Sequence, residues 1–411
     1  MAISLTQHTK RISPEQWFMV SALIVNGGNY LYNLLLGRIL GPTQFADAAI
    51  LITVLLVLSF VAMTFQLAVA KFSLHFTGVQ QHQFIQWAYL VSVGIGMVLG
   101  LAMVLGAAGL QALFQTESKL MFIIFGCATP LYFLMSINRG RWQGEQSFVA
   151  LAMTYQLEMF ARLGITLVLL LLFQSSPAIS VALGMGLSFI AGFFPYKKIY
   201  KAVTTVRINT KDKKLLLHFL LCTAFYELTQ IICNNSDILL VKHYFPQYEA
   251  GLYASLALIG RVVYFVTWMV IMVLLPKVIA LKKEGKPTHT ILMTYCTYIS
   301  VFAGGIVAFT FLFPAFAVQL LFGEAYLSIA PLLGWYALAT ALFAISNIFA
   351  YYFLSLDRYI PVALGAFGGV LQVILICYFH TSLYQVVLMQ VIAMGILCAL
   401  QLGYFFFLKN K

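Results

Sequence analysis

Charged residues are scarce in this sequence, and their scarcity excludes a soluble protein. Asp, Glu, Lys and Arg make up 9% of the 411 residues, whereas hydrophobic residues make up 62%. A soluble domain needs many more polar side chains to cover its surface. The mean hydropathy of +0.94 therefore indicates an integral membrane protein with little chain left for a soluble domain.

The sequence also lacks the short motifs of soluble catalysis. It contains no P-loop, no HExxH, no nucleophile elbow and no DxD motif in a soluble segment. Its six cysteines have no CxxC spacing and lie in or beside apolar segments, which argues against metal and disulfide sites. We therefore expect no enzymatic activity, no metal and no cofactor.

Apolar runs separated by short polar breaks extend through almost the whole chain. A membrane-spanning helix needs about 20 mostly apolar residues. On that length the pattern predicts an all-α integral membrane fold with about twelve spans, at residues 17 to 37, 46 to 70, 84 to 109, 120 to 137, 148 to 173, 177 to 195, 215 to 241, 250 to 275, 290 to 313, 328 to 353, 360 to 379 and 384 to 408.

The basic residues predict the orientation, because Lys and Arg resist translocation and collect in cytoplasmic loops. With the N-terminus inside, only Arg38, Lys119 and Lys242 fall on the outer side, and Arg162 and Arg261 fall within spans. All other Lys and Arg residues then lie in the cytoplasm, which explains the net charge of +12 without a nucleic-acid partner. We predict that both termini are cytoplasmic.

An internal repeat divides the chain into two halves. Moving the first half along the chain by 204 positions superimposes equivalent residues of the two copies: Asn33 on Asp237, Arg38 on Lys242, Pro42 on Pro246 and Ala46 on Ala250. Since six spans return the chain to its starting side, the two pseudo-symmetric bundles should be related by an axis along the membrane normal. The cleft between them is typical of an alternating-access transporter.

The repeat predicts three parts of the chain. Residues 1–195 form an N-terminal six-helix lobe, 196–214 a basic cytoplasmic linker, and 215–411 a C-terminal six-helix lobe. The linker is the densest basic stretch, for which we expect contact with anionic lipid headgroups. Regulation or docking of a partner is the alternative.

The first copy of the repeat carries a family likeness. The segment from Asn33 to Ala46, NLLLGRILGPTQFA, resembles the N-L-L-L-G-R-x-L-G-P-x-x-F/Y-G signature of Wzx-type polysaccharide-biosynthesis (O-antigen) flippases of the MOP exporter superfamily. Ala46 replaces the last glycine of that signature. The second copy, from Pro246 to Tyr253, resembles the matching turn of the family before the eighth span.

The resemblance implies a MOP/MATE-like fold with a central cavity between the lobes. It implies that the protein flips a polyprenyl-diphosphate-linked oligosaccharide, the repeat unit of an O-antigen, capsule or exopolysaccharide, from the inner to the outer leaflet. The expected location is the bacterial inner membrane. Membrane lipids, and possible neighbours such as a polysaccharide polymerase and glycosyltransferases, are the expected partners.

Polar side chains within spans are candidates for the cavity wall, because they are costly to expose to lipid. Two symmetry-related spans, the first and the seventh, present such residues at helical spacings: Asn26, Asn29, Asn33, Gln230, Asn234 and Asp237. We predict that these stripes bind the substrate. Hydrogen bonding between helices inside one lobe is the alternative.

Arg261 lies within the eighth span and has no acidic residue within four positions in sequence. Its planar guanidinium group suits a phosphate, so we predict contact with the diphosphate. A cross-helix ion pair with Glu227 or Asp237 is the alternative. An Arg261 that faces the cleft unpaired would favour an anionic substrate.

Glu158 and Arg162 in the fifth span are four residues apart, a spacing that allows an ion pair within one helix. The pair is either structural or part of a gate or ion-coupling site. Glu227 and Asp237 are the other carboxylates available for coupling. The sequence does not distinguish H⁺ from Na⁺ as the coupling ion.

Cations near the ends of spans are candidates for contact with the lipid headgroup. Arg38 and Lys242 are symmetry mates at the outer ends of the first and seventh spans, where interfacial anchoring is the alternative role. On the inner side the candidates are Lys71, Arg139, Arg141 and Lys277.

Two other functions stay open at this point. A MATE-like multidrug or cation antiporter would share the fold and the repeat, but its cavity should be aromatic and acidic. A membrane polysaccharide polymerase or transferase normally keeps catalytic residues on a sizeable outer loop. The longest predicted outer loop, residues 314 to 327, has Glu324 as its only charge.

Overall fold

The protein is described by a computed structural model that covers residues 14–172, 176–197, 210–264, 274, 278, 281–282, 284–356 and 358–409. Within these ranges every regular element is a helix. The helices of the first half are α1 (Pro14–His75), α2 (Gly78–Leu105), α3 (Ala107–Phe114), α4 (Leu120–Gly144), α5 (Phe148–Leu172) and α6 (Pro177–Gly192). Those of the second half are α7 (Thr210–Tyr244), α8 (Gln247–Gly260), α10 (His289–Leu312), α11 (Pro314–Leu321), the 3₁₀ helix η1 (Glu324–Leu332), α12 (Leu333–Ser355), α13 (Ile360–Tyr378) and α14 (Leu383–Lys409).

The first two predicted spans form two helical segments that are joined at a kink in the middle of α1. Gly41 has a φ of 69° and a ψ of 173°, outside the helical region. A positive φ costs glycine little because it has no Cβ. Pro42 follows without an N–H to continue the hydrogen bonding, so the helix changes direction there.

The other predicted spans each coincide mainly with one helix, although the third also reaches α3 and the tenth also includes part of η1. Of the eighth, 250 to 275, residues 250–264 and 274 lie within the described residues. In the described part of the chain, nine helices are long and apolar enough to cross a membrane; α1 counts once and α6 is shorter. The all-α membrane fold is therefore confirmed. The count of twelve spans and the cytoplasmic termini stay predictions.

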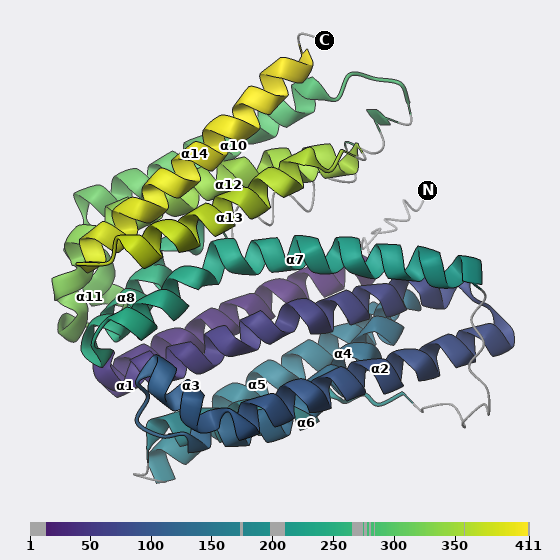
Figure 1. Ribbon diagram of the computed structural model, residues 1–411, viewed down its shortest axis with the longest axis horizontal. Coiled ribbons are helices and arrows are strands. Elements are labelled where there is room, and N and C mark those ends of the chain that lie inside the picture. Colours follow the sequence, from purple (N-terminus) through teal and green to yellow (C-terminus); the bar gives the residue numbers. More distant parts are fainter. Residues whose placement is uncertain are drawn as a thin grey trace, which may run out of the picture.

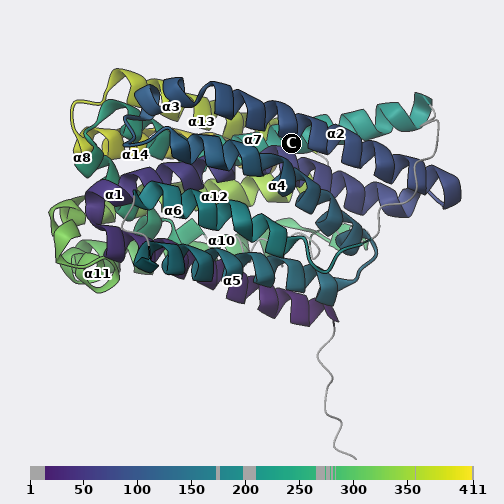
Figure 2. The ribbon, with the colours of Figure 1, turned by 90° about the horizontal axis from the view of Figure 1, so that it is seen from below.

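The two halves of the chain join at one end of the molecule, where α1 kinks, α8 begins and α11 lies (Figure 1). The largest cluster of buried hydrophobic residues crosses between them there, and includes Phe45, Phe122, Tyr253, Phe322 and Tyr326. Both views place α11 and α8 at this end (Figures 1 and 2). We call it the closed end.

At the opposite end, α10, α12, α13 and α14 diverge from α1, α2 and α4 (Figure 1). The buried hydrophobic residues there form separate clusters. One contains Phe72 and Phe84 of the first half with Leu216 at the start of α7; another contains Phe349 and Phe405 of the second half. We call it the open end. The first turns of α7 thus pack against the N-terminal lobe, although the sequence assigns them to the C-terminal lobe.

Candidate functional site

Arg261 and Asp237 form an ion pair inside the C-terminal lobe, where α7, α8 and α12 meet. Arg261 Nη2 donates to Asp237 Oδ1 at 2.9 Å, and its Nε donates to the Tyr336 hydroxyl at 3.1 Å. The Tyr336 and Tyr253 hydroxyls donate to Asp237 Oδ2 at 2.8 and 3.1 Å. We call these four residues the C-terminal charge cluster.

The C-terminal charge cluster is electrically neutral and fully hydrogen-bonded at the carboxylate. Asp237 is completely buried, and both of its oxygens accept hydrogen bonds. A buried carboxylate with a guanidinium partner and two hydroxyl donors is satisfied without a ligand. Of the two roles considered for Arg261, this conformation therefore has the cross-helix ion pair.

A second cluster lies inside the N-terminal lobe, between α4 and α5. Arg139 Nη2 donates to Glu158 Oε2 at 2.7 Å and to the Thr154 carbonyl at 2.9 Å. The Arg139 guanidinium also lies over the Tyr155 ring, 3.9 Å from its centroid. Arg162 pairs with the other oxygen, Glu158 Oε1, across one helical turn. The intrahelical pair expected from the spacing is thus present, and Arg139 joins it.

The N-terminal charge cluster, Arg139, Glu158 and Arg162, carries one net positive charge because two guanidinium groups share one carboxylate. All three side chains are at most 12% exposed. Arg162 Nη1 lies 3.5 Å from Asn29 Oδ1 of α1, and Arg162 Nε has no hydrogen-bond partner among the described residues. A buried cation without full compensation is costly within a membrane and marks a functional candidate.

The residues of the two predicted polar stripes make different kinds of contact. Asn29 contacts Arg162 of α5, and Asn33 Nδ2 donates back to the Asn29 carbonyl at 2.8 Å. In α7, Gln230 Nε2 donates to Asn347 Oδ1 of α12 at 3.1 Å, and Asn234 Nδ2 donates to the Gln230 carbonyl at 2.9 Å. Asn26 is exposed. Asn29 and Gln230 therefore make the interhelical contacts of the alternative within one lobe, whereas the bonds of Asn33 and Asn234 stay within their own helices.

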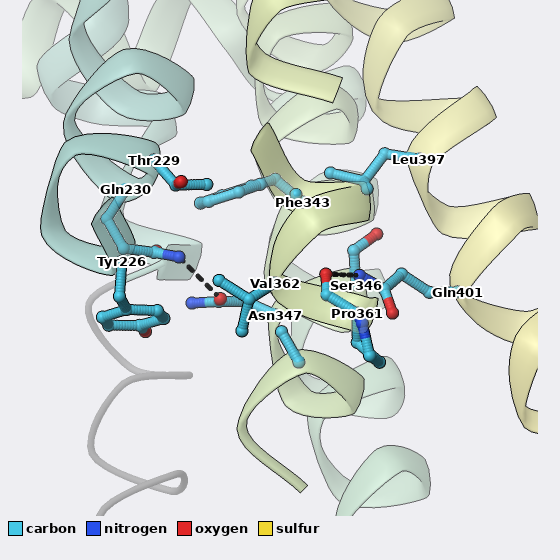
Figure 3. A pocket seen from close by; sticks show the side chains of 12 residues that line it. Tyr226, Thr229, Gln230, Phe343, Ser346, Asn347, Pro361, Val362, Leu397 and Gln401 are labelled. Atoms are coloured by element: carbon cyan, nitrogen blue, oxygen red, sulfur yellow. Dashed lines mark hydrogen bonds between the residues drawn. The ribbon is translucent and has the colours of Figure 1, made fainter. Parts of the chain in front are cut away.

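Gln230 and Asn347 line a small cavity between α7, α12, α13 and α14 (Figure 3). Asn347 Nδ2 and Gln401 Oε1 are buried there without hydrogen-bond partners among the described residues. The cavity of about 10 Å³ holds about one water molecule. It is too small for a sugar.

Three cations predicted to contact lipid headgroups are instead buried. Lys242, Arg139 and Arg141 are 2%, 4% and 1% exposed. Lys242 Nζ pairs with Asp47 Oδ1 at 2.8 Å, and Arg141 Nη1 donates to the Lys197 carbonyl at 3.2 Å. The sequence places each cation near a span end, but only the tertiary structure shows that neighbouring helices extend past it and supply partners.

The remaining headgroup candidates lie in different surroundings. Arg38 donates to backbone carbonyls of α11, and Lys71 is exposed with its ammonium group 4.2 Å from the centroid of the Phe219 ring. Lys277 lies outside the described residues. Glu227 of α7 is half-buried and has no hydrogen bond or ion pair within the described part of the chain.

Asp47, Thr154 and Tyr336 complete these networks but were not singled out from the sequence. Asp47 lies inside the predicted span 46 to 70, and an acid within a span is a signal that could have identified it. The tyrosine and threonine carry no such signal, because both residue types are common in membrane helices.

Solved structures of other proteins share the fold of this chain. The chain superimposes on a structure described as the inward-facing conformation of a multidrug resistance MATE family transporter of the MOP superfamily, with a TM-score of 0.76, 13% identity and coverage of 93% of this chain and 95% of that chain. It superimposes on lipid II flippase MurJ, inward closed conformation, with a TM-score of 0.75, 16% identity and coverage of 95% and 87%. The TM-score for an outward-facing MATE transporter is 0.57, at 16% identity and 95% coverage of both chains. The protein thus has the fold of MOP superfamily transporters.

The family follows from the sequence itself. Residues 35–331 match the family described as polysaccharide biosynthesis protein, which is more than half of the chain. The chain belongs to this family, and the resemblance noted from Asn33 to Ala46 is confirmed. A search of curated proteins finds no significant match.

Proposed function

We propose that the protein is a flippase that moves a polyprenyl-diphosphate-linked oligosaccharide, an O-antigen, capsule or exopolysaccharide repeat unit, from the inner to the outer leaflet by alternating access. The family and the fold support a lipid-linked flippase or transporter. The observation that carries the substrate class is the surplus positive charge of the N-terminal charge cluster.

A diphosphate is the ligand that this charge fits. Arginine binds phosphate through paired N–H groups, and the attraction is strong where water is excluded. Arg162 has an unused Nε and lies against Asn29 of α1, the helix that packs against both α7 and α8 of the other lobe. The same surplus charge would repel the organic cations expected for a multidrug antiporter.

The closed end is proposed to face outward. This rests on the predicted topology, in which Arg38 and Lys242 are outer residues. The open end then faces the cytoplasm, and this conformation accepts substrate from that side. Location in the bacterial inner membrane, and work alongside a polymerase and glycosyltransferases, belong to the same proposal.

The test is export of surface polysaccharide in cells that lack the native protein, complemented with wild type, Arg162→Gln or Arg162→Lys at matched membrane levels. Arg162→Gln removes the surplus charge but leaves Glu158 paired with Arg139, so the protein should fold. We expect export to fall at least about tenfold, the effect of losing one charged contact of ~1.5 kcal/mol, with accumulation of the lipid-linked precursor inside. Arg162→Lys should restore part of it.

Normal export with Arg162→Gln would refute a role for the N-terminal charge cluster in substrate binding. Normal polysaccharide with the whole chain deleted would refute the flippase and favour an antiporter.

For the coupling ion we propose Glu227. Four acids of the described residues lie inside the predicted spans, and three of them, Asp47, Glu158 and Asp237, are each paired with a cation. Glu227 alone among them is free to exchange H⁺ or Na⁺.

The test uses proteoliposomes with and without the coupling gradient. Collapse of the gradient should slow transport by the wild-type protein. The Glu227→Gln variant should transport at the same rate whether the gradient is present or collapsed. A Glu227→Gln variant that still responds to the gradient would refute this assignment.

A further inference from the structure

Two repeat-related cations lie at the closed end of the molecule. Arg38 precedes Pro42 in the first repeat as Lys242 precedes Pro246 in the second. Each lies near the end of the first helix of its repeat, beside the turn into the next helix. Their partners, however, are not equivalent.

Arg38 of α1 binds the C-terminal end of α11 in the other lobe. Its Nε donates to the Leu321 carbonyl at 2.7 Å, and its Nη2 donates to the carbonyls of Leu320 and, at 3.4 Å, Gln319. The last carbonyls of a helix have no partner within the helix and carry the negative end of its dipole. A guanidinium group is therefore well suited to hold this end of α11.

Lys242 of α7 binds the other lobe in the reverse direction. Its Nζ lies 2.8 Å from Oδ1 of Asp47, which follows the kink of α1, and both side chains are only 2% exposed. The contact is an ion pair and not an aligned hydrogen bond. The other oxygen of Asp47 accepts a hydrogen bond from the Glu117 backbone N–H at 2.9 Å, which fixes the carboxylate within the N-terminal lobe.

The surfaces between these two contacts are tightly packed. A Cβ on Gly251 of α8 would overlap the carbonyl of Pro42, so only glycine allows this approach. The Tyr326 hydroxyl donates to the Gly37 carbonyl at 2.7 Å. His243 Nδ1 lies 2.8 Å from the Leu113 carbonyl of α3.

The open end has no equivalent of these contacts among the described residues. There the N-terminal lobe contacts only the first turns of α7, through His75 and Asp212 at 3.9 Å and through Lys71 over the Phe219 ring. The lobes otherwise meet through α1 with α7, α8, α11 and η1, and through α3 with α7. Among the described residues, the contacts of Arg38 with α11 and of Lys242 with Asp47 therefore join the lobes at the closed end and have no counterpart at the open end.

We propose that Arg38 and Lys242 form a two-part latch that holds the closed end shut, each cation being anchored in the opposite lobe. To open this end, the α11 carbonyls must release Arg38 and Asp47 must release Lys242. The latch rests on the alternating-access part of the proposed function, and it holds for any transported molecule.

The experiment measures the separation of the lobes directly. Spin labels attached through noncanonical amino acids at Leu105 of α2 and Leu312 of α10 leave the six native cysteines in place. Both positions lie at the closed end and are 77% and 72% exposed, outside the latch. Pulsed electron paramagnetic resonance in lipid nanodiscs then gives the distance distribution without any substrate.

The test variant combines Asp47→Asn with Lys242→Met, which removes the ion pair without leaving a buried charge. We expect the ratio of molecules with a long distance between the two labels (closed end open) to molecules with a short one (closed end shut) to rise at least about tenfold. It should rise further when Arg38→Gln is added. The matched control combines Glu145→Gln with Lys197→Met. That pair lies within the N-terminal lobe at the open end, and its removal should leave the distances unchanged.

An unchanged distribution in the test variant, or an equal change in the control, would overturn the latch. If the neutral variant does not accumulate, the exchange of Asp47→Lys with Lys242→Asp decides: a closed-end distance like that of wild type supports the latch, and its loss refutes it. Because no transport is measured, an incorrect substrate assignment leaves this result unaffected.

Discussion

In the N-terminal lobe, Arg139 and Arg162 share Glu158, whereas in the C-terminal lobe Arg261 has Asp237 to itself. The repeat does not relate these clusters: the equivalent of Asp237 is Asn33, and that of Arg261 is Val57. One lobe thus carries a surplus charge on α4 and α5, and the other a neutral pair between α7 and α8. The difference shows that the halves share a backbone repeat, while of these two clusters only the N-terminal one has an uncompensated charge.

The largest effect should come from removing the acid that two arginines share. Glu158→Gln leaves two buried guanidinium groups without a counterion, so we expect the free energy of unfolding to fall by more than the ~3–5 kcal/mol typical of one broken buried pair. Asp237→Asn, which leaves one arginine unpaired, should cost less. Thermal unfolding of both variants in one detergent measures the order, and the reverse order would contradict the charge count.

Removing the arginine of the neutral pair should come next. Arg261→Met leaves Asp237 buried with only hydroxyl donors, at an expected cost of ~3–5 kcal/mol. Adding Asp237→Asn should recover most of that loss, because the remaining charge is gone. Unfolding midpoints of the single and double variants form the test; no recovery would mean that packing and not charge dominates this cluster.

The corresponding change in the N-terminal lobe should be far milder. Arg162→Met leaves Glu158 paired with Arg139, so we expect a loss of only ~1 kcal/mol, about that of one hydrogen bond. The same unfolding assay applies. An effect as large as that of Arg261→Met would show that the surplus charge is structural and would weaken its proposed role in substrate binding.

A steric effect of intermediate size is expected at the seam where the lobes meet. Gly251→Ala places a methyl group on the Pro42 carbonyl and should cost about 1–3 kcal/mol through overpacking. Gly27→Ala on α1 is the control. It has open space around its Cβ position and should be neutral or stabilising by up to ~1 kcal/mol. Equal melting temperatures for both variants would argue against a tight seam.

The sequence predicted the helices well because the membrane allows few alternatives. A spanning segment must satisfy its backbone hydrogen bonds internally, so apolar length alone predicts a helix. The repeat and the turn at Pro42 and Pro246 were also visible, as was the spacing of Glu158 and Arg162. The break between the first two spans was predicted as well, and the structure has non-helical backbone there, at Gly41.

The partners of the charged residues could not be predicted. Asp237 is 24 positions from Arg261, and Asp47 is far from Lys242 in sequence. Long side chains such as that of Lys242 can point to the headgroups or fold back against a neighbouring helix, and hydropathy does not distinguish the two. The polar stripe of α7 was likewise visible, but not the helices that it faces.

By itself, the sequence determined that the chain is a helical membrane protein with an internal repeat and a likeness to polysaccharide flippases, because these properties depend on local composition and spacing. Only the tertiary structure decided which charges are compensated and which end is closed. Both depend on contacts between different helices, which spacing along the chain does not reveal: Arg139 of α4 joins the pair on α5, and each lobe supplies a cation that the other lobe binds.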